Sequence, residues 1–277
     1  MQFKSTISFG GVPEHFNFPW KIWINQMDVK QEEFNWVWND FPGGSGAMIQ
    51  SLEYGEIDVA IVLTEALANA KIKGLDLIPL STFVKSPLVW GIFTSADNPT
   101  NKIGPMENMK IAISRFGSGS ELMAKVFARE RSEILNESNF VIVNNLEGGR
   151  LALLNGDADL FFWEKWMTKP LVDSSELKMI GEIPTPWPCF LAVCKPKFYN
   201  NELKMKAIMN NYLKVLEIAK GLKQGEATHR ELSRNYGLKP DDAKEWLSKV
   251  EWANGWETPA QPLDLATATL QEIYSLN

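Results

Sequence analysis

The fold is decided by a stretch that occurs twice in the sequence. Residues 50–60 read QSLEYGEIDVA, and about a hundred residues later residues 151–161 read LALLNGDADLF. In each copy, apolar residues at helical spacing lead to a glycine, an acidic turn follows, and an apolar strand begins. A glycine at this place ends a helix, because it adopts the left-handed conformation without strain. The repeat therefore predicts two related lobes that each contain helices and strands.

Strand-like apolar runs alternate with helical patterns along most of the chain, which is typical of an α/β fold. The predicted strands are residues 1–10, 57–63, 75–80, 89–94, 110–114, 140–143, 160–163 and 190–193. Residues 84–94 and 183–193 are interpreted as two crossovers between the lobes. The first lobe is then discontinuous, comprising residues 1–92 and 190–277, and the second lobe, residues 93–189, is inserted into it. Beyond about residue 200 the pattern is helical.

Two glycine-rich turns each precede a predicted helix, one turn in each lobe. They are Phe41-Pro42-Gly43-Gly44-Ser45-Gly46 and Arg115-Phe116-Gly117-Ser118-Gly119-Ser120. Glycine lets the backbone approach a ligand closely, and the free N–H groups of a helix start favour an anion or a carbonyl oxygen. Neither turn is a nucleotide motif, because Leu122 replaces the third glycine of the dinucleotide fingerprint and no Gly-Lys-Ser/Thr follows. A single such turn is more often a connector, but one in each lobe predicts donors that face each other across a cleft. The candidates here are Gly43, Gly44, Ser45, Arg115, Phe116, Gly117, Ser118, Gly119 and Ser120.

Further candidates follow the predicted strands, at the carboxyl ends where open α/β sheets bind their ligands. After the first strand come Gly10, Gly11, Val12, Pro13, His15 and Phe16, and after the repeated strands come Thr64, Glu65, Trp163 and Glu164. His15 is either a cleft residue or a buried hydrogen-bonding residue, and Glu164 is either a cleft residue or a solvated one. Trp163 suits the wall of a site for a flat ligand. Trp90 and Trp187, on the crossovers, either line the cleft floor or pack the hinge.

Composition and charge exclude several classes of partner. A formal net charge of −6 and a pI near 5.2 argue against nucleic acid, which needs clustered Lys and Arg. No apolar run approaches the roughly 20 residues that span a bilayer, so no membrane insertion is expected. No secretory signal is visible. The expected location is the cytoplasm, or the periplasm if a leader has been removed.

The sequence contains no recognisable catalytic or metal-binding set. Its two histidines and two cysteines include no His-Glu-x-x-His or Cys-x-x-Cys motif, and Gly-x-Ser-x-Gly is also absent. Cys189 and Cys194 lie in one extended segment, roughly 17 Å apart, which is too far for a disulfide bond. We therefore expect no metal, no cofactor and no catalytic residue.

Residues 43–63, with the motif Leu-x-x-Gly-Glu-x-Asp-Val-Ala after a glycine-rich helix start, resemble the first-lobe signature of the type 2 periplasmic binding protein superfamily. Residues 113–120 resemble its second-lobe loop. The resemblance covers nearly the whole chain and is closest to the nitrate, sulfonate and taurine binding group, which also contains the thiamin pyrimidine synthase proteins. Within it, the chain looks like a fungal and bacterial branch with a member from Candida.

This resemblance implies an α/β fold of two lobes joined by two hinge crossovers, with a small ligand bound between them. The expected ligand is flat or anionic, of pyrimidine, sulfonate or carboxylate type, and a transporter partner is left open. One alternative is a single-turnover pyrimidine synthase that uses a cleft histidine and pyridoxal phosphate. Against it, the chain lacks that branch's cysteine-rich motif, and Lys21 is the only lysine that adjoins the turn bearing His15. A second alternative is an interaction protein whose cleft is filled by its own side chains.

Overall fold

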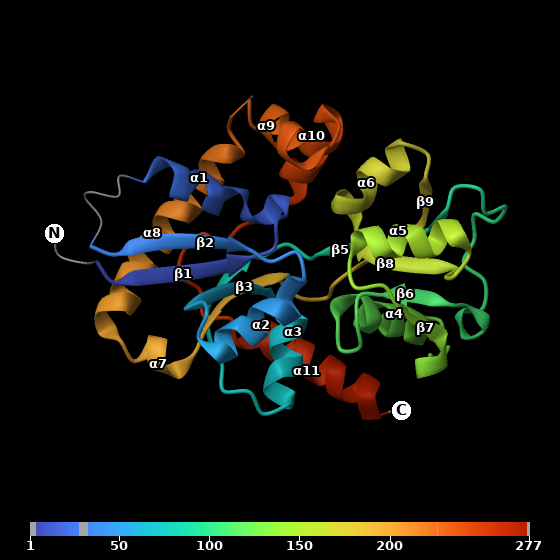
Figure 1. The fold of residues 1–277 in the computed structure, drawn as a ribbon, viewed down its shortest axis with the longest axis horizontal. Coiled ribbons are helices and arrows are strands. Elements are labelled where there is room, and N and C mark those ends of the chain that lie inside the picture. Colours follow the sequence, from blue (N-terminus) through green and yellow to red (C-terminus); the bar gives the residue numbers. More distant parts are fainter. Residues whose placement is uncertain (1–3, 28–32, 226, 276–277) are drawn as a thin grey trace.

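The computed structural model describes residues 4–27, 33–225 and 227–275, which fold into two lobes placed side by side (Figure 1). Each lobe is built on a five-stranded sheet with helices on both sides. The first sheet has the order β2-β1-β3-β10-β4 and the second the order β7-β6-β8-β5-β9. These observations show the α/β, two-lobed fold that the repeat predicted.

The two sheets have the same topology. In the first, β1 pairs in parallel with β2 and β3, while β10 runs antiparallel between β3 and β4. In the second, β6 pairs in parallel with β7 and β8, while β5 runs antiparallel between β8 and β9. The strands are β1 Thr6–Gly11, β2 Asn35–Asp40, β3 Val59–Leu63, β4 Ile78–Val84, β5 Val89–Ser95, β6 Ile111–Ile113, β7 Phe140–Ile142, β8 Leu160–Glu164, β9 Leu177–Pro184 and β10 Phe190–Cys194.

The repeated sequence explains this equivalence. One copy forms the end of α2 (Gly44–Tyr54) and the start of β3, and the other forms the end of α5 (Leu146–Asn155) and the start of β8. Gly55 and Gly156 end the two helices with φ of 73° and 76°, a conformation that costs a glycine little. Both copies therefore build the same helix, turn and central strand.

The remaining helices cover the sheets and reach across from one lobe to the other. They are η1 His15–Asn17, α1 Phe18–Gln26, α3 Thr64–Ile72, η2 Met106–Asn108, α4 Gly119–Glu130, η3 Glu137–Asn139, α6 Lys165–Asp173, α7 Pro196–Tyr199, α8 Glu202–Leu222, α9 Thr228–Tyr236, α10 Pro240–Lys249 and α11 Ala260–Ser275. As expected, the chain beyond residue 200 is mostly helical. Helix α8 packs on α1, and α11 packs on α3 and also touches α4 of the second lobe.

The chain passes between the lobes twice, and the two connections are hydrogen-bonded to each other. The backbone N–H of Thr185 donates to the carbonyl of Leu88 (2.9 Å), and that of Leu88 donates to the Thr185 hydroxyl (3.0 Å). The N–H of Cys189 also donates to the carbonyl of Ser86 (3.2 Å). The connections are thus residues 85–88 and 185–189. We propose lobe boundaries there; the boundary expected at residue 92 lies inside β5, and the one at residue 190 is the start of β10.

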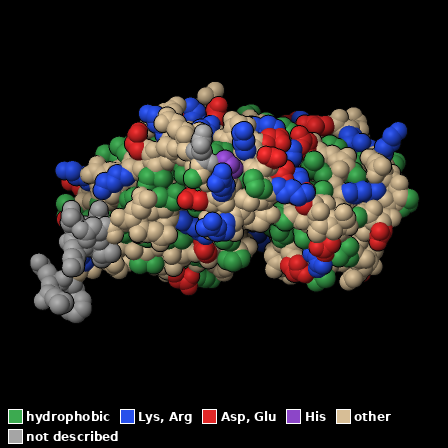
Figure 2. Space-filling model, turned by 90° about the horizontal axis from the view of Figure 1, so that it is seen from above, with side chains coloured by type: hydrophobic (Ala, Val, Ile, Leu, Met, Phe, Trp, Pro, Cys, Tyr) green, Lys and Arg blue, Asp and Glu red, His purple; other side chains and the backbone are tan. Residues whose placement is uncertain are grey.

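Large aromatic side chains fill the first lobe. Trp20 and Phe9 pack with ring centroids 4.8 Å apart, and Trp36, Phe83 and Tyr212 extend the cluster. Cys189 and Cys194 are buried and free. On the face in Figure 2, Lys and Arg are interspersed with Asp and Glu. This face therefore lacks the one-sided basic surface that nucleic acid requires.

Candidate functional site

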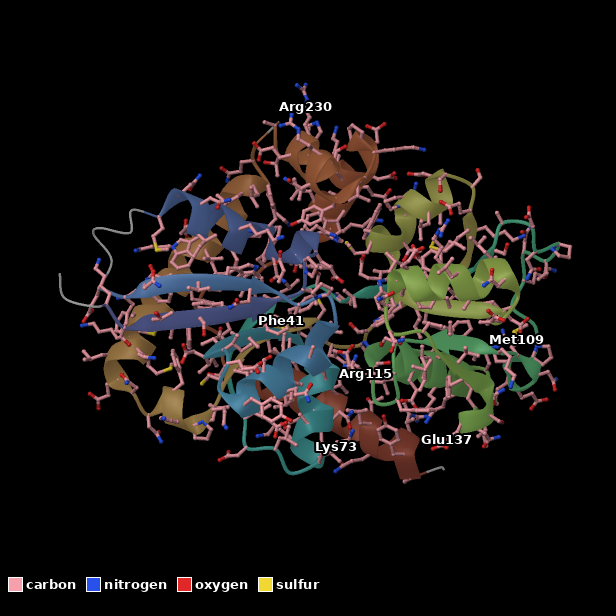
Figure 3. The ribbon with its side chains drawn as sticks, viewed as in Figure 1. Phe41, Lys73, Met109, Arg115, Glu137 and Arg230 are labelled. Atoms are coloured by element: carbon pink, nitrogen blue, oxygen red, sulfur yellow. The ribbon has the colours of Figure 1, made fainter. Side chains whose placement is uncertain are left out.

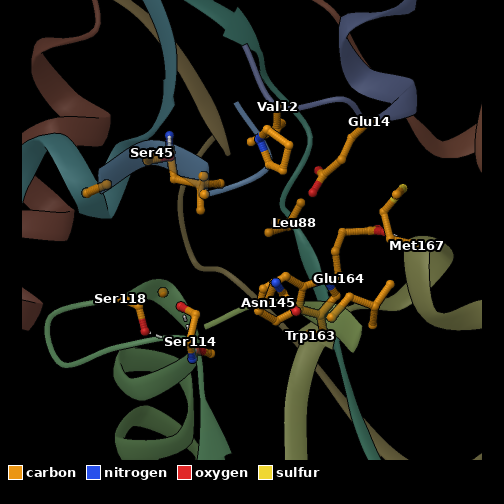
Figure 4. Close-up of a pocket in the computed structure, with 18 of the residues that line it drawn as sticks. Val12, Glu14, Ser45, Leu88, Ser114, Ser118, Asn145, Trp163, Glu164 and Met167 are labelled. Atoms are coloured by element: carbon orange, nitrogen blue, oxygen red, sulfur yellow. Dashed lines mark hydrogen bonds between the residues drawn. The ribbon is translucent and has the colours of Figure 1, made fainter. Parts of the chain in front are cut away.

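A cavity of about 330 Å³ lies between the two lobes, at the carboxyl ends of the parallel strands (Figure 4). It is lined by Val12, Pro13, Glu14, Pro42, Gly43, Gly44, Ser45, Leu63, Ala66, Leu88, Trp90, Ser114, Arg115, Ser118, Gly119, Ser120, Asn144, Asn145, Leu146, Glu147, Trp163, Glu164, Met167 and Phe190. Both lobes, the first connection (Leu88) and the start of β10 (Phe190) therefore contribute to one cavity.

Eleven of these lining residues are sequence-predicted candidates. They are Val12, Pro13, Gly43, Gly44, Ser45, Arg115, Ser118, Gly119, Ser120, Trp163 and Glu164. The starts of α2 and α4 thus face the same cavity, one from each lobe, as the paired glycine turns suggested. Figure 4 shows Ser45 on the opposite side of the cavity from Ser114 and Ser118. Backbone N–H groups at a helix start are suited to bind an anion or a carbonyl oxygen.

The serine hydroxyls at the start of α4 are already engaged within the protein. Ser118 caps α4 by accepting from Glu121 N, and its hydroxyl lies 2.9 Å from that of Ser120. The Ser120 hydroxyl also accepts from Ser114 N (3.0 Å). These bonds hold the turn in shape, so the backbone of the turn and the remaining capacity of the hydroxyls are what a ligand can use.

Eight other predicted residues do not line the cavity: Gly10, Gly11, His15, Phe16, Thr64, Glu65, Phe116 and Gly117. The two strand glycines let neighbouring side chains pack, since a Cβ on Gly10 would lie 2.7 Å from Ile57 and one on Gly11 would lie 2.3 Å from Trp38. Phe116 is exposed. Gly117, with φ of 75°, accepts through its carbonyl from Asn69 Nδ2 of the first lobe (3.1 Å). The two strand glycines thus allow close packing within the first lobe, and Gly117 links the second lobe to the first.

Thr64 and Glu65 hold the first lobe to the second crossing strand. The Thr64 hydroxyl donates to the Pro188 carbonyl, and its backbone N–H donates to the Cys189 carbonyl (3.0 Å). Trp187 Nε1 donates to Glu65 Oε2 (2.8 Å). Trp187 is therefore packed at the crossing, whereas Trp90 lines the cavity. Of the two roles considered for both tryptophans, Trp187 has the hinge-packing role and Trp90 the cavity-lining role.

His15 lies behind the cavity wall in an aromatic enclosure. Its ring is fully buried, with centroids 4.6 Å from Phe16 and 4.3 Å from Trp246. Burial lowers the pKa of His15 to about 3, so the imidazole is neutral at neutral pH. Its Nε2 lies 3.9 Å from Glu164 Oε1, which is too long for a hydrogen bond.

Two carboxyl groups with raised pKa values line the cavity. Burial raises the pKa of Glu14 to about 7. Burial, and then the charge of Glu14, raise the pKa of Glu164 well above its usual range. Glu164 also caps α6, since its Oε2 accepts from Met167 N (2.6 Å). Glu164 is therefore a buried cavity residue, which excludes the alternative of a solvated loop residue.

Arg115 is the cation of the cavity and lies where the lobes face each other (Figure 3). Its guanidinium group reaches the first lobe at Gly46, where a Cβ would lie 2.0 Å from a guanidinium nitrogen. Within the described residues this group makes no hydrogen bond and no ion pair. Partial burial lowers the pKa of the guanidinium, but arginine keeps its proton in proteins. An unpaired, half-buried cation in a cavity is suited to an anionic ligand.

Sequence reasoning missed several lining residues, chiefly Glu14 and the segment 144–147. Glu14 lies within the turn already singled out. Residues 144–145 precede α5 and residues 146–147 begin it, just as residues 42–43 precede α2 and residues 44–45 begin it. The repeat contains this signal, because it equates α5 with α2 and hence the turns before them. Asn145 caps α5 by accepting from Gly148 N (2.9 Å), so a third helix start faces the cavity.

Two negative findings apply to the described residues. No group of three or more His, Cys, Asp and Glu side chains there is arranged to hold a metal ion. None of the helices there is both long and apolar enough to cross a membrane. The chemistry available at the cavity is thus that of carboxyls, one guanidinium group, amides, hydroxyls and indoles.

Comparison with known proteins gives a consistent fold and relationship. The sequence profile of the Ca3427-like PBP family matches residues 90–183. The CA3427 gene product of Candida albicans, whose family has the generic periplasmic binding protein fold, is 26% identical, with a TM-score of 0.85 over 98% of this chain and 90% of that one. No curated protein matches the sequence.

More distant structures share the fold. The alkanesulfonate-binding protein SsuA of Xanthomonas axonopodis pv. citri, bound to MOPS, has a TM-score of 0.82 at 13% identity, over 99% of this chain and 94% of that one. SsuA of Escherichia coli has a TM-score of 0.73 at 14% identity, over 99% and 93%. With two equivalent α/β lobes, two crossings and a cavity between them, the chain has the two-lobed fold of periplasmic binding proteins and is similar to the Ca3427-like family.

Proposed function

We propose that this protein reversibly binds one small molecule in the cavity between its lobes and closes around it by hinge motion at residues 85–88 and 185–189. The observation that carries the proposal is the convergence of helix starts from both lobes on one cavity of about 330 Å³. A cavity of this size suits a small ligand, and movement of the lobes about the two connections would admit and release it.

The ligand we propose is small and flat or anionic, of pyrimidine, sulfonate or carboxylate type. Trp90 and Trp163 provide aromatic surface for a flat molecule, and the unpaired Arg115 with the starts of α2 and α4 suits an anionic group. The SsuA structures are described as sulfonate-binding, but at 13% and 14% identity they support the fold alone.

Neither alternative has a specific observation in its favour. A synthase that uses pyridoxal phosphate needs a lysine in the site, and no lysine is among the described cavity residues. Lys21 instead pairs with Asp40 (3.3 Å) outside it. A degenerate cleft would be filled by its own tryptophans, whereas Trp90 and Trp163 border open space.

Native mass spectrometry of freshly purified protein tests the proposal, since a retained ligand adds a defined mass that is lost on unfolding. Readdition of that compound at about 100 times its Kd should stabilise the fold by about 2.7 kcal/mol in thermal or urea unfolding. Small-angle scattering should show compaction. If no retained compound is found, and pyrimidines, sulfonates and carboxylates cause neither compaction nor stabilisation, the binding role is wrong.

A further inference from the structure

We propose that the cavity recognises a nitrogen base, whose N–H hydrogens are bound by the carboxyl groups of Glu14 and Glu164, one from each lobe. The inference rests on the proposed binding function and specifies its ligand. In this arrangement Glu14 and Glu164 bind one end of the ligand and Arg115 faces its other end. The ligand is then bipolar, with hydrogen-bond donors at one end and an oxygen or anionic group at the other.

The first argument is the position and unused capacity of Glu164. The residue is 3% exposed and borders the cavity. Its Oε2 is engaged at the start of α6, but Oε1 has no hydrogen-bond partner among the described residues. Nε2 of the neutral His15 is 3.9 Å away, too far for a hydrogen bond. A buried carboxyl oxygen without a partner costs free energy, which a donor on a ligand would recover.

The second argument is that Glu14 faces the same space from the other lobe. Figure 4 shows the Glu14 side chain pointing into the cavity from the first-lobe side, with Glu164 on the second-lobe side. Glu14 follows β1 and Glu164 ends β8, so closure of the lobes brings the two carboxyls together. Their mutual repulsion favours a proton, a cation or a donor between them.

The third argument is an independent unpaired group in the same cavity. Trp90 is 5% exposed, borders the cavity, and its Nε1 has no partner among the described residues. An indole N–H is only a donor, so it calls for an acceptor on the ligand. The carboxyl pair calls for donors. Groups that carry both, such as amides and aminated heteroaromatic rings, satisfy the two demands together.

The charges around the pair set the pH dependence. Glu14 faces Glu164, the neutral His15 and, on α9, Tyr236; Glu164 is also near Lys165 and Cys189. Glu147 and Arg115 complete the charged lining. Glu14 loses its proton near pH 7, so a cationic probe should bind up to about tenfold tighter at pH 8 than at pH 6.

The test compares benzamidine, benzamide and benzoate by calorimetry at pH 6 and pH 8, because these flat probes share a ring but carry a cation, a neutral amide and an anion. Benzamidine should bind most tightly at pH 8 and gain affinity between the two pH values. Glu14→Gln should remove most of that gain, because Glu14 is the group that titrates near pH 7, whereas Glu164→Gln should weaken benzamidine binding at both pH values. The amide oxygen introduced by Glu164→Gln can still accept from Met167 N, so the cap of α6 is kept, and circular dichroism confirms folding.

Glu130→Gln is the matched control, because Glu130 is exposed at the far end of α4, and it should leave all three affinities unchanged. The inference is overturned if benzamidine fails to bind at millimolar concentration at pH 8, if benzoate binds more tightly there, if Glu14→Gln keeps the pH gain, or if Glu164→Gln binds benzamidine as tightly as the wild type. Benzoate binding without benzamidine binding leaves the proposed function intact. Absence of any probe binding, together with no retained compound in native mass spectrometry, removes both.

Discussion

Glu65 is a carboxyl group enclosed by protein on all sides. It is 2% exposed, and its Oε2 accepts from Trp187 while Oε1 has no partner among the described residues. Burial raises the pKa of Glu65 to about 7, against the smaller opposing effects of a backbone bond and the Trp187 bond. The protonated form is thus favoured in the folded protein more than in the unfolded chain.

The sign of this shift predicts a pH effect on stability. Because the folded pKa is raised, the favourable contribution is present below about pH 4.5 and is lost as pH rises through about 7. Glu65→Gln removes this titration and keeps an acceptor for Trp187. The free energy of unfolding of the wild type relative to this variant should therefore fall by up to about 3 kcal/mol between pH 4.5 and pH 8. Urea unfolding of both proteins across this range measures it; a constant difference would contradict the assignment.

His15 illustrates what the sequence leaves undecided at this scale. Its place after the first strand was correctly predicted, but a histidine there can point into a cleft or away from it. The outcome depends on Tyr236 and Trp246, more than two hundred residues later, whose rings enclose it. Local patterning contains no information on contacts that distant, so the direction of the side chain required the structure.

At the scale of elements, the start of α4 is fixed by close packing against the first lobe and β5. A Cβ on Gly119 would lie 2.7 Å from Cζ2 of Trp90 and 3.2 Å from Oε1 of Glu65. Gly119 does not have positive φ, whereas Gly117 does. The glycine at 119 is therefore needed for the approach of these two side chains, and not for an unusual backbone conformation.

Gly119→Ala should destabilise the protein by about 1–3 kcal/mol, since the indole of a buried tryptophan must move. Thermal unfolding measures the loss, and the fluorescence of Trp90 should change with it. Gly221→Ala is the matched control, because a Cβ at this helical position of α8 meets nothing within 4 Å. It should instead stabilise by about 0.5–1 kcal/mol. Equal stability of Gly119→Ala and wild type would show that the turn has room to spare.

The elements themselves were largely predictable, for a physical reason. Central strands such as β3 and β8 are apolar on both faces, so they stand out as continuous apolar runs. The strands absent from the prediction, β2 and β9, both lie at sheet edges. These two strands mix buried and exposed residues irregularly, as Leu177–Pro184 does, unlike the edge strand β4, which is mostly buried and was predicted in part.

At the scale of the whole molecule, ion pairs join the lobes on the side of α6 and α10. Lys169 of α6 pairs with Asp242 of α10 (3.0 Å) and with Asp173 of its own helix. Lys239, which precedes α10, pairs with Asp173 (3.2 Å). On the opposite side Arg129 of α4 pairs with Glu272 of α11. These contacts favour the arrangement of the lobes seen in this structure.

Lys169→Met should weaken this contact between the lobes and favour a more open form. Partly exposed pairs are worth up to about 1 kcal/mol, so the balance between closed and open forms should shift about fivefold toward the open form. Small-angle scattering should show a larger radius of gyration for the ligand-free variant, and about 1 M salt should produce a similar change in the wild type. Lys249→Met is the control, because Lys249 pairs with Glu245 inside α10. If both variants scatter identically to the wild type, these pairs do not govern closure.

The position of β10 also sets an order in which the chain can fold during synthesis. The strands of the second sheet run without interruption from Val89 to Pro184, whereas the first sheet needs β10, which starts at Phe190 and lies between β3 and β4. In a nascent chain, β3 and β4 therefore lack the strand that lies between them until the whole second sheet has left the ribosome. The first lobe is begun first but completed last, and the inserted second lobe can fold before the first lobe is complete.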